Sequence, residues 1–567
     1  MALYRAIDIF FRISCILVVV AAELTTKPSL EQACLNAVPI FNSIHSATRQ
    51  WGSSLNHNGL AIIPAKVPKG NLLYHGTHSS DIKTTGLEWL AFEPEHSEAF
   101  SASWRARQKR DTSVSEQVPV HGLDDNDRSQ EPQSGTSAEQ PPIRGYLRTY
   151  QASRDLNLLY FDGMSAAKGC LGTVDTQDLV MRMINGTSPC DQFFVDIMIH
   201  DIARVSEICD IITPLGYDGL LRMEVGFEIV YCDFDDGGLH LLSQLRRPFW
   251  DKMKAWYDFA RMSFHMARAA SQHYDGMAEA GRLQLDFSRM ISAYFYPINV
   301  TNPNEDAEDH APGARTFPRL LFTTHHERQS IQRRVQDVAG TRSGPGINWQ
   351  AIVDAIVSRY ADRLALLAEL SPAIQHSDAS LFAAEVFTAT NTYVNYLSTP
   401  DDISLLATDA EEEALSRARC QNHYLQQVKP SKSSFTPEDH LIHAAITQVT
   451  GRICETLFQA RSNIQEAYQS ELRDQETRSS ALSQAAEVSQ ESVRGLVRDL
   501  QWTGWEKCAT CAVDELCFVP MFPFGSPEDA KRPHCIDEGA VGLGLNLSNN
   551  YWRVDVLNAF QSMTDPS

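Results

Sequence analysis

The pattern of apolar and polar positions is clearest just after residue 70. The apolar run Leu72-Leu73-Tyr74 stops at His75-Gly76-Thr77. Apolar, β-compatible residues that end at Gly and Thr predict a strand followed by a tight turn. Because glycine has no side chain, the backbone of Gly76 is open to close approach, with a histidine beside it.

A second informative pattern lies far downstream, between residues 216 and 234. The run Phe227–Tyr231 predicts a strand that is apolar except for one carboxylate, Glu228. Burying an unpaired carboxylate is costly. Two interpretations follow: Glu228 points outward from an edge strand, or it has a functional role.

Between these two patterns, strands and short helices alternate. Tyr146–Tyr150 and Leu156–Phe161 are predicted to be paired strands joined by a turn at residues 152–155. The sequence Asp162–Gly169 satisfies neither GxxxxGK[ST] nor GxSxG, and we interpret it as a strand-to-helix turn. Residues 201–212 are predicted to be a helix. The pattern predicts an α+β domain.

After Gly237-Gly238 the pattern becomes helical. Pro248–Gln272 is a long amphipathic candidate whose aromatic and methionine stripe indicates packing. Helices are also expected over Gly276–Tyr294 and in four later stretches, the last of them polar. The later stretches are Tyr360–Leu370, Leu381–Leu397, Asp439–Phe458 and Ala460–Leu500.

Composition narrows the class of protein. A chain of 567 residues has room for two to four domains, and 43% hydrophobic residues can fill sizeable cores. The formal net charge of −22 argues against nucleic acid as the main partner, because phosphates would be repelled. The composition is typical of a soluble acidic globular protein.

The N-terminus has the pattern of a secretory signal peptide, residues 1–22. Arg5 and Arg12 precede an apolar core, and Val20-Ala21-Ala22 supplies small residues for cleavage. The alternative is an anchor that stays attached, but the apolar run is short for a membrane span. No stable membrane insertion is therefore expected. Secretion also agrees with three candidate glycosylation sites at Asn185, Asn299 and Asn546.

The cysteines fit an oxidising compartment. Without Cys15 of the signal, eleven remain, so at least one is a free thiol or forms an intermolecular bond. Four of them form a C-terminal group that could make two disulfides or hold zinc, and in a secreted chain disulfides are favoured. These four candidates are Cys508, Cys511, Cys517 and Cys535.

Outside the C-terminal cysteine group, no stretch has the spacing of a metal site, and no metal is assigned. His325-His326-Glu327 lacks the HExxH spacing, and His75 and His78 lack neighbouring ligands. Residues 106–142 are rich in Ser, Gln, Asp, Glu, Pro and Gly and are predicted to be a disordered insertion. The predicted organisation is a signal peptide (1–22), an α+β domain (23–240) with the insertion 106–142, an α-helical domain (241–500) and a Cys-rich segment (501–567).

Taken together, the two opening patterns resemble a known family. Tyr74-His75-Gly76-Thr77 is similar to the strand and turn of ADP-ribosyltransferases of the diphtheria-toxin and poly(ADP-ribose) polymerase type. Trp89 and Phe100, with a separation of 100 − 89 = 11, stand where that family places two aromatic residues, although the first is usually Tyr. The Glu228 strand resembles the last signature strand. The resemblance covers roughly residues 52–238.

The resemblance implies a split β-sheet domain that uses NAD⁺ as substrate. Glu228 would be the catalytic carboxylate, and His75 would bind the adenosine-side ribose. Gly76 would hold the nicotinamide carboxamide through its backbone, while Trp89 and Phe100 would stack on the ring. Tyr74 and Thr77 complete the motif. The implied activity is mono-ADP-ribosyl transfer to an unknown protein or small-molecule acceptor, or NAD⁺ hydrolysis.

A second class of function stays open. The chain also resembles uncharacterised secreted proteins of filamentous fungi, through the signal peptide, the YHGT motif, the sequence LYFDGMS and the C-terminal CxxC. The alternative is therefore a non-enzymatic, effector-type binding protein on a degenerate ADP-ribosyltransferase fold. An accessory protein of fungal secondary metabolism is a third possibility that the residues do not address.

Overall fold

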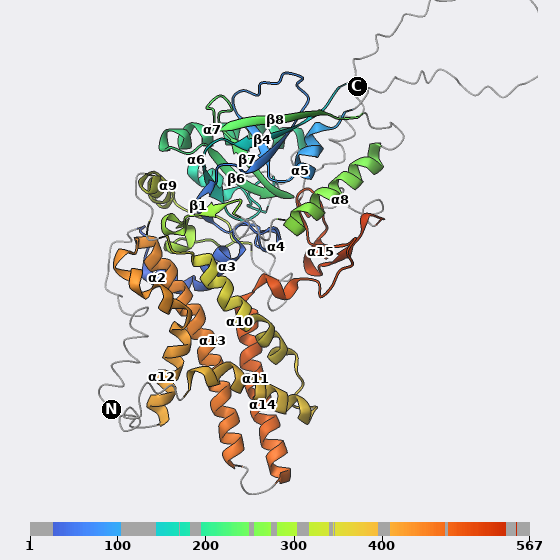
Figure 1. Ribbon diagram of the computed structural model, residues 1–567. Coiled ribbons are helices and arrows are strands. Elements are labelled where there is room, and N and C mark those ends of the chain that lie inside the picture. Colours follow the sequence, from blue (N-terminus) through green and yellow to red (C-terminus); the bar gives the residue numbers. More distant parts are fainter. Residues whose placement is uncertain are drawn as a thin grey trace, which may run out of the picture.

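The computed structural model shows a mixed α/β molecule, with a curled N-terminal sheet followed by a helical region and a disulfide-linked C-terminal segment (Figure 1). It describes residues 26–103, 143–168, 171–181, 194–248, 255–273, 281–302, 317–339, 344, 346–394, 409–470, 475–539 and 551–552. The predicted signal peptide, the insertion 106–142 and the candidate sites Asn185 and Asn546 lie outside the described residues.

Ten strands form one sheet in the described part of the chain, in the order β10-β1-β5-β6-β7-β3-β2-β4-β8, with β9 also paired to β1. Every neighbouring pair is antiparallel except β5 and β6, which are parallel. The strands are β1 (Ala61–Val67), β2 (Leu72–Thr77), β3 (Glu88–Ala91), β4 (Tyr146–Ala152), β5 (Leu156–Phe161), β6 (Gly219–Glu224), β7 (Gly226–Tyr231), β8 (Leu239–Arg246), β9 (Gln284–Leu285) and β10 (Ile291–Ser292).

The predicted pairing of β4 with β5 is wrong. β4 pairs with β2 and β8, whereas β5 pairs with β1 and β6, so four strands separate the two. The link of residues 153–155 can span only about 10 Å, while five strand spacings amount to about 24 Å in a flat sheet. The sheet must therefore curl until β4 and β5 approach each other. Asn71 accepts a hydrogen bond from the Ala152 N–H at this corner.

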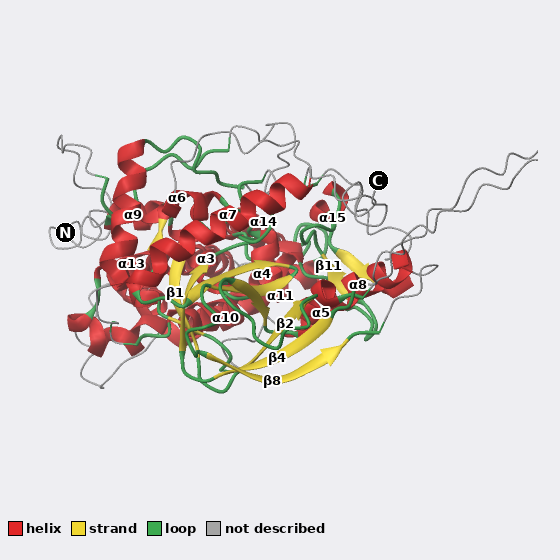
Figure 2. Cartoon of the chain, turned by 90° about the horizontal axis from the view of Figure 1, so that it is seen from above, coloured by secondary structure: helices red, strands yellow, loops and turns green. Residues whose placement is uncertain are grey.

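Short helices cover the faces of the sheet and fill its connections. The helix α5 packs on β2 and β3 and lies next to β2 in Figure 2, whereas α7 packs on β6. The helix predicted at residues 201–212 is the second half of α7. The elements are α2 (Leu30–Leu35), α3 (Ala37–Ser46), α4 (Gln50–Leu55), α5 (Pro94–Glu98), η1 (Ala99–Ser101), α6 (Asp175–Met181), α7 (Phe194–Ile212), η2 (Thr213–Leu215) and α8 (Ala255–His273).

The segment after α8 returns to the sheet. A helix was expected over residues 276–294, but the described part of that segment forms β9 and β10 with the short turns η3 (Phe287–Arg289) and η4 (Ala293–Phe295) between and after them. Both strands pair with β1. The apolar spacing that suggested a helix instead buries Phe287, Ile291 and Phe295 against the core. The sheet thus extends beyond residue 240, where the sequence suggested a boundary.

The helical region is built around two long helices, α13 and α14, which pack side by side (Figure 1). It shares one hydrophobic core with the sheet. The N-terminal helix α3 also packs on α13, and the Asn42 amide donates to the Leu500 carbonyl at 2.9 Å. The elements are α9 (His325–Ala339), α10 (Trp349–Glu369), α11 (His376–Thr390), η5 (Asn391–Tyr393), α12 (Asp409–Asn422), η7 (Tyr424–Ser434), α13 (Pro437–Ser470) and α14 (Gln475–Leu500).

The C-terminal segment contains η8 (Thr503–Glu506), β11 (Leu516–Phe518), α15 (Pro527–Lys531) and β12 (His534–Ile536). The disulfide interpretation of its four cysteines is confirmed: Cys508 bonds Cys517 and Cys511 bonds Cys535. Two further disulfides join α7 to the end of β7 (Cys209–Cys232) and α12 to α13 (Cys420–Cys454). Among the described helices, none combines the length and apolar character needed to cross a membrane.

Candidate functional site

Three adjacent strands, β2, β3 and β7, carry most of the residues singled out by the sequence. The ladder places Tyr74 opposite Ala91 and Ala91 opposite Glu228. Residues directly opposite one another project from the same face of a sheet, and so do residues two apart on one strand. Gly76, Trp89 and Glu228 therefore belong to one face, which we call the Glu228 face.

The Glu228 face is covered over β2 by α5 and η1. A Cβ placed on Gly76 would lie 2.1 Å from the Ser97 carbonyl oxygen and 3.0 Å from Phe100. The close approach that glycine permits here is thus made by the chain's own backbone. Phe100 itself is 50% exposed, and Trp89 is partly buried.

Substitution of Gly76 by alanine tests this contact. The new methyl group would collide with the Ser97 backbone carbonyl, which cannot rotate away as a side chain could. We expect the free energy of unfolding to fall by about 1–3 kcal/mol, as for overpacked sites. Urea denaturation measures this free energy. Gly504→Ala is the control, because nothing lies within 4 Å of a Cβ placed there; Gly86→Ala is unsuitable, because the positive φ of Gly86 would strain an alanine. Equal stability of Gly76→Ala and wild type would contradict the contact.

His75 lies on the opposite face from Glu228, because it alternates with Tyr74 and Gly76 along β2. Its Nδ1 is 2.7 Å from the Trp89 carbonyl oxygen, and its ring lies near Phe234. Burial lowers the pKa of His75 to about 4, so the ring is neutral at pH 7. The His75 side chain thus lies on the other face of the sheet from Glu228, and its ring contacts the Trp89 backbone.

The backbone around His75 explains this arrangement. β2 pairs with β4 along its whole length, but its ladder with β3 consists of the single pair Tyr74–Ala91. Beyond that pair the two strands diverge, and the His75 ring bridges them through the Trp89 carbonyl. Thr77, at the end of β2, accepts a hydrogen bond from the Ser79 N–H and takes no part on the Glu228 face.

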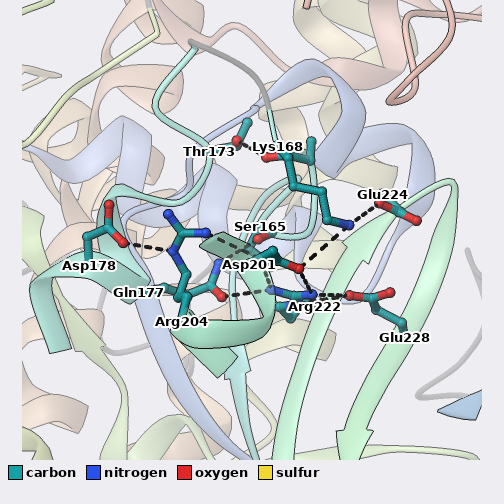
Figure 3. Close-up of polar contacts among 11 residues, drawn as sticks. Ser165, Lys168, Thr173, Gln177, Asp178, Asp201, Arg204, Arg222, Glu224 and Glu228 are labelled. Atoms are coloured by element: carbon teal, nitrogen blue, oxygen red, sulfur yellow. Dashed lines mark hydrogen bonds and ion pairs between the residues drawn. The ribbon is translucent and has the colours of Figure 1, made fainter. Parts of the chain in front are cut away.

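A cluster of buried charges surrounds Glu228 (Figure 3). Arg222 lies opposite Glu228 in the β6–β7 ladder, and its Nε donates to Glu228 Oε1 at 2.8 Å. Arg222 also makes a bidentate pair with Asp201 of α7, at 2.9 and 2.8 Å. Lys168 Nζ, from the turn after β5, is 2.8 Å from Glu224 Oε2. We call Lys168, Asp201, Arg222, Glu224 and Glu228 the charge cluster.

The charge cluster contains three carboxylates and two fixed cations, so full ionisation would leave one net negative charge. Burial alone would raise the pKa of Asp201, but Arg222 and Lys168 hold that pKa well below its usual range. Burial, reinforced by repulsion from Glu228, raises the pKa of Glu224 to about 7 despite the neighbouring Lys168. Near neutral pH Glu224 is therefore protonated in part of the molecules, which relieves the excess negative charge, and ionised in the rest.

His96 lies next to two carboxylates of the charge cluster, Glu224 and Glu228. It lies on α5, is 3% exposed, and one of its ring nitrogens is within 4.8 Å of both Glu224 and Glu228. Its buried Nδ1 has no hydrogen-bond partner among the described residues. Burial lowers the pKa of His96 to about 4, so it contributes a neutral imidazole beside the carboxylates.

Acidification should lower the stability of the folded protein, because His96 is buried as a neutral imidazole. Because its folded-state pKa of about 4 lies below the value near 6.5 of an unfolded histidine, the unfolded state binds more protons between these pH values. Stability is thus lost as pH falls through this window. We expect His96→Gln to reduce the stability loss between pH 7 and 5 by on the order of 2 kcal/mol. Urea titrations at both pH values measure it, and identical losses in variant and wild type would refute it.

Most residues of the charge cluster were not predicted from the sequence. Arg222 and Glu224 interrupt an apolar strand as Glu228 does, so the same signal was present there. Lys168 lies in the stretch interpreted as a strand-to-helix turn, and that backbone interpretation gave its side chain no role. Asp201 and His96 carry no signal in one sequence, since their importance comes only from tertiary packing.

Two cavities lie elsewhere in the molecule. One of about 530 Å³ is lined by parts of β1, β9 and the start of α10, and one of about 380 Å³ lies between α3 and the loop at residues 300–302. Neither is lined by Trp89 or Glu228. Near the second cavity, Asn299 of the predicted glycosylation motif is exposed and accepts a hydrogen bond from the Thr301 N–H.

Two family models match the chain. One, described as the YPL277C N-terminal domain, matches residues 31–254, and the other, the YPL277C C-terminal domain, matches residues 348–475. Uncharacterized protein YOR389W of Saccharomyces cerevisiae is 25% identical over 557 residues, which cover 89% of this chain and 84% of that protein. Uncharacterized protein YPL277C of the same yeast is 36% identical over 214 residues, covering 37% of this chain and 43% of that protein.

The first matched region contains β1 to β8 and the whole charge cluster, and the second contains α10 to the end of the described part of α13. No solved structure matches the chain. The names of the two yeast relatives state no activity. A functional conclusion must therefore come from the site itself.

Proposed function

We propose that this chain is a secreted NAD⁺-cleaving enzyme of the ADP-ribosyltransferase type, acting as a mono-ADP-ribosyltransferase or NAD⁺ glycohydrolase. The observation that carries the proposal is the common face of Trp89 and Glu228 on the adjacent strands β3 and β7. These are the residues to which the sequence resemblance assigns stacking on nicotinamide and the catalytic carboxylate. The divergence of β2 from β3 beside Gly76 agrees with the split sheet of that family.

The chemistry suits a fixed carboxylate. Cleavage of the bond between nicotinamide and ribose builds positive charge on the ribose, as in glycoside cleavage. A pre-oriented carboxylate stabilises that charge. Arg222 would hold Glu228 in one orientation, through contacts of 2.8 and 2.6 Å to a single carboxylate oxygen, Oε1. The second oxygen would then face the ribose, while Trp89 would pack against the leaving ring.

His75 receives a different role from the one the resemblance implies. Its ring faces away from Glu228 and bonds the Trp89 carbonyl. We propose that His75 positions Trp89, and with it the stacking surface, rather than contacting the ribose.

Secretion is part of the proposal. Four disulfides lie within the described residues, and disulfides persist mainly in oxidising compartments. The exposed Asn299 is available to a glycosylating enzyme. Both observations support the signal-peptide interpretation of residues 1–22.

The test is NAD⁺ turnover by protein expressed in a secretory host. We expect release of free nicotinamide by the wild type and a loss of about a hundredfold in Glu228→Gln, the scale seen when one electrostatic or acid–base group is removed. Glu88→Gln is the matched control, because Glu88 is on β3 but shares the opposite face with Tyr231. Turnover in Glu228→Gln at the wild-type rate would remove Glu228 from the mechanism.

A second function, non-enzymatic binding, is favoured by one observation. Glu228 is only 4% exposed, and it lines neither the cavity beside β1 nor the cavity beside α3. A binding protein on the same fold would show no nicotinamide release under any condition. Calorimetry with NAD⁺ then separates a binder of the dinucleotide from a protein that recognises something else.

A further inference from the structure

We infer that Glu224 is the general base that activates water at this site, so that the reaction ends in hydrolysis rather than in transfer to a protein. The inference rests on the proposed NAD⁺ cleavage and names its acceptor. It assigns a catalytic role to a residue that the sequence analysis did not single out.

The position of Glu224 follows from the β6–β7 hairpin. Glu224 is two residues beyond Arg222 on β6, and Arg222 lies opposite Glu228, so all three side chains belong to the Glu228 face. The hairpin turns at Val225 and Gly226, whose φ of +88° favours glycine. Glu224 and Glu228 thus bring carboxylate oxygens within 4.8 Å of each other. In retaining glycosidases, carboxyl groups about 5–5.5 Å apart divide the work: one acts at the sugar carbon and the other as acid and then as base for the attacking water.

The two carboxylates have different partners, and this difference separates their roles. Glu228 is held by Arg222, a cation that keeps its charge at any physiological pH. Glu224 is held by Lys168, whose ammonium is also 3.9 Å from Asp201. A general base must take up a proton easily, and burial raises the pKa of Glu224 to about 7.

The groups that face Glu224 come from every element packed around it. They are Lys168 from the turn after β5, Asp201 from α7, Arg222 from β6, Glu228 from β7 and His96 from α5. His96 is neutral at pH 7 and has a buried nitrogen without a partner in the described chain. One His96 ring nitrogen lies within 4.8 Å of carboxylate oxygens of both Glu224 and Glu228, and a water molecule held between His96 and Glu224 would be the nucleophile.

The same three side chains, His96, Glu224 and Glu228, could also be considered for a metal ion. Lys168 and Arg222 already pair with the two carboxylates, at 2.8 and 2.6 Å. A divalent cation would have to displace these buried cations or lie against them. The charge cluster therefore fits a water molecule and a mobile proton better than a metal.

The reaction balances as follows. The bond between ribose C1′ and the pyridinium nitrogen breaks, and its electron pair stays on nitrogen to give neutral nicotinamide. The water oxygen then bonds C1′, and one of its protons passes to the Glu224 carboxylate and on to solvent. NAD⁺ and water yield ADP-ribose, nicotinamide and one proton, with no other reactant.

The test compares nicotinamide release and product identity in wild type and Glu224→Gln. We expect the wild type to form ADP-ribose with a rate that falls below pH about 7, and Glu224→Gln to lose about a hundredfold. Sodium azide, a nucleophile that needs no base, should restore release in the variant and give an azido product. A structural role alone would not be rescued by azide.

The outcomes separate the two proposals. A wild type that releases no nicotinamide overturns NAD⁺ cleavage itself. A wild type that is active while Glu224→Gln keeps its rate and its acid limb overturns only the role of Glu224. If Glu224→Gln fails to fold, the wild-type profile decides: absence of an acid limb, or ADP-ribose attached to added protein as the main product, overturns the hydrolytic assignment.

Discussion

Replacing Arg222 with methionine is expected to lower the free energy of unfolding by about 3–5 kcal/mol, the usual cost of breaking a buried ion pair from one side. Arg222 is completely buried and is the common partner of Asp201 and Glu228, which are 1% and 5% exposed. Methionine fills much of the volume but removes the cation that pairs with Glu228 and the bidentate partner of Asp201, which keeps only Arg204 at 3.3 Å and Lys168 at 3.9 Å. Urea denaturation followed by circular dichroism measures the change.

Arg452→Met is the matched control for this experiment. Arg452 pairs with Asp499 on the helical region, where the two side chains are 34% and 59% exposed. Exposed ion pairs contribute about 0–1 kcal/mol because water and salt screen them. If Arg222→Met cost no more than Arg452→Met, the charge cluster would not contribute to stability in the way described.

Trp349→Ala is expected to destabilise the protein by about 3–5 kcal/mol, the range for removing a large aromatic side chain from a core. Trp349 begins α10, is fully buried, and donates from Nε1 to Asp439 at 2.8 Å. Its ring meets Phe435 and His443 edge to face. The substitution leaves both a cavity and a carboxylate, Asp439, without this donor.

Trp349→Phe separates these two losses. Phenylalanine keeps most of the ring packing but lacks the indole N–H, so about 1–3 kcal/mol should remain as the cost of the unmatched Asp439. Phe322→Ala serves as the surface control, since Phe322 is 51% exposed. Differential scanning calorimetry on the three variants gives the order. A Trp349→Ala variant as stable as Phe322→Ala would contradict the buried role of Trp349.

The local elements were largely predictable from the sequence, because they depend on short-range patterns. The strand ending at His75-Gly76-Thr77 and the strand through Glu228 are present as β2 and β7. The C-terminal disulfides also followed from cysteine number and compartment. For the strands, neighbouring residues carry the whole signal, whereas the disulfides also required the compartment indicated by residues 1–22.

Strand pairing was not predictable in the same way. A three-residue link usually joins neighbouring strands, but after β4 it crosses a corner of the curled sheet to β5. The candidate site shows the same limit. Glu228 was identified from its own strand, whereas His96, Lys168 and Asp201 reach it from three other segments that share no sequence pattern with it. That His75 and Glu228 lie on opposite faces of the sheet could be known only from the register between β2, β3 and β7.

The hydrogen bond between Asn42 and Leu500 has a consequence for biosynthesis. The two residues are 458 positions apart. At about 5–20 residues per second, a ribosome needs roughly 20–90 s to deliver the second partner after the first has emerged. For most of that interval the apolar side of α3, which includes Phe41 and Ile44, lacks the helices α10 and α13 that pack on it, and Phe41 lacks the ring of Trp502. The nascent chain must therefore pass through a long period in which chaperone protection, rather than its own core, keeps its first helices from aggregating.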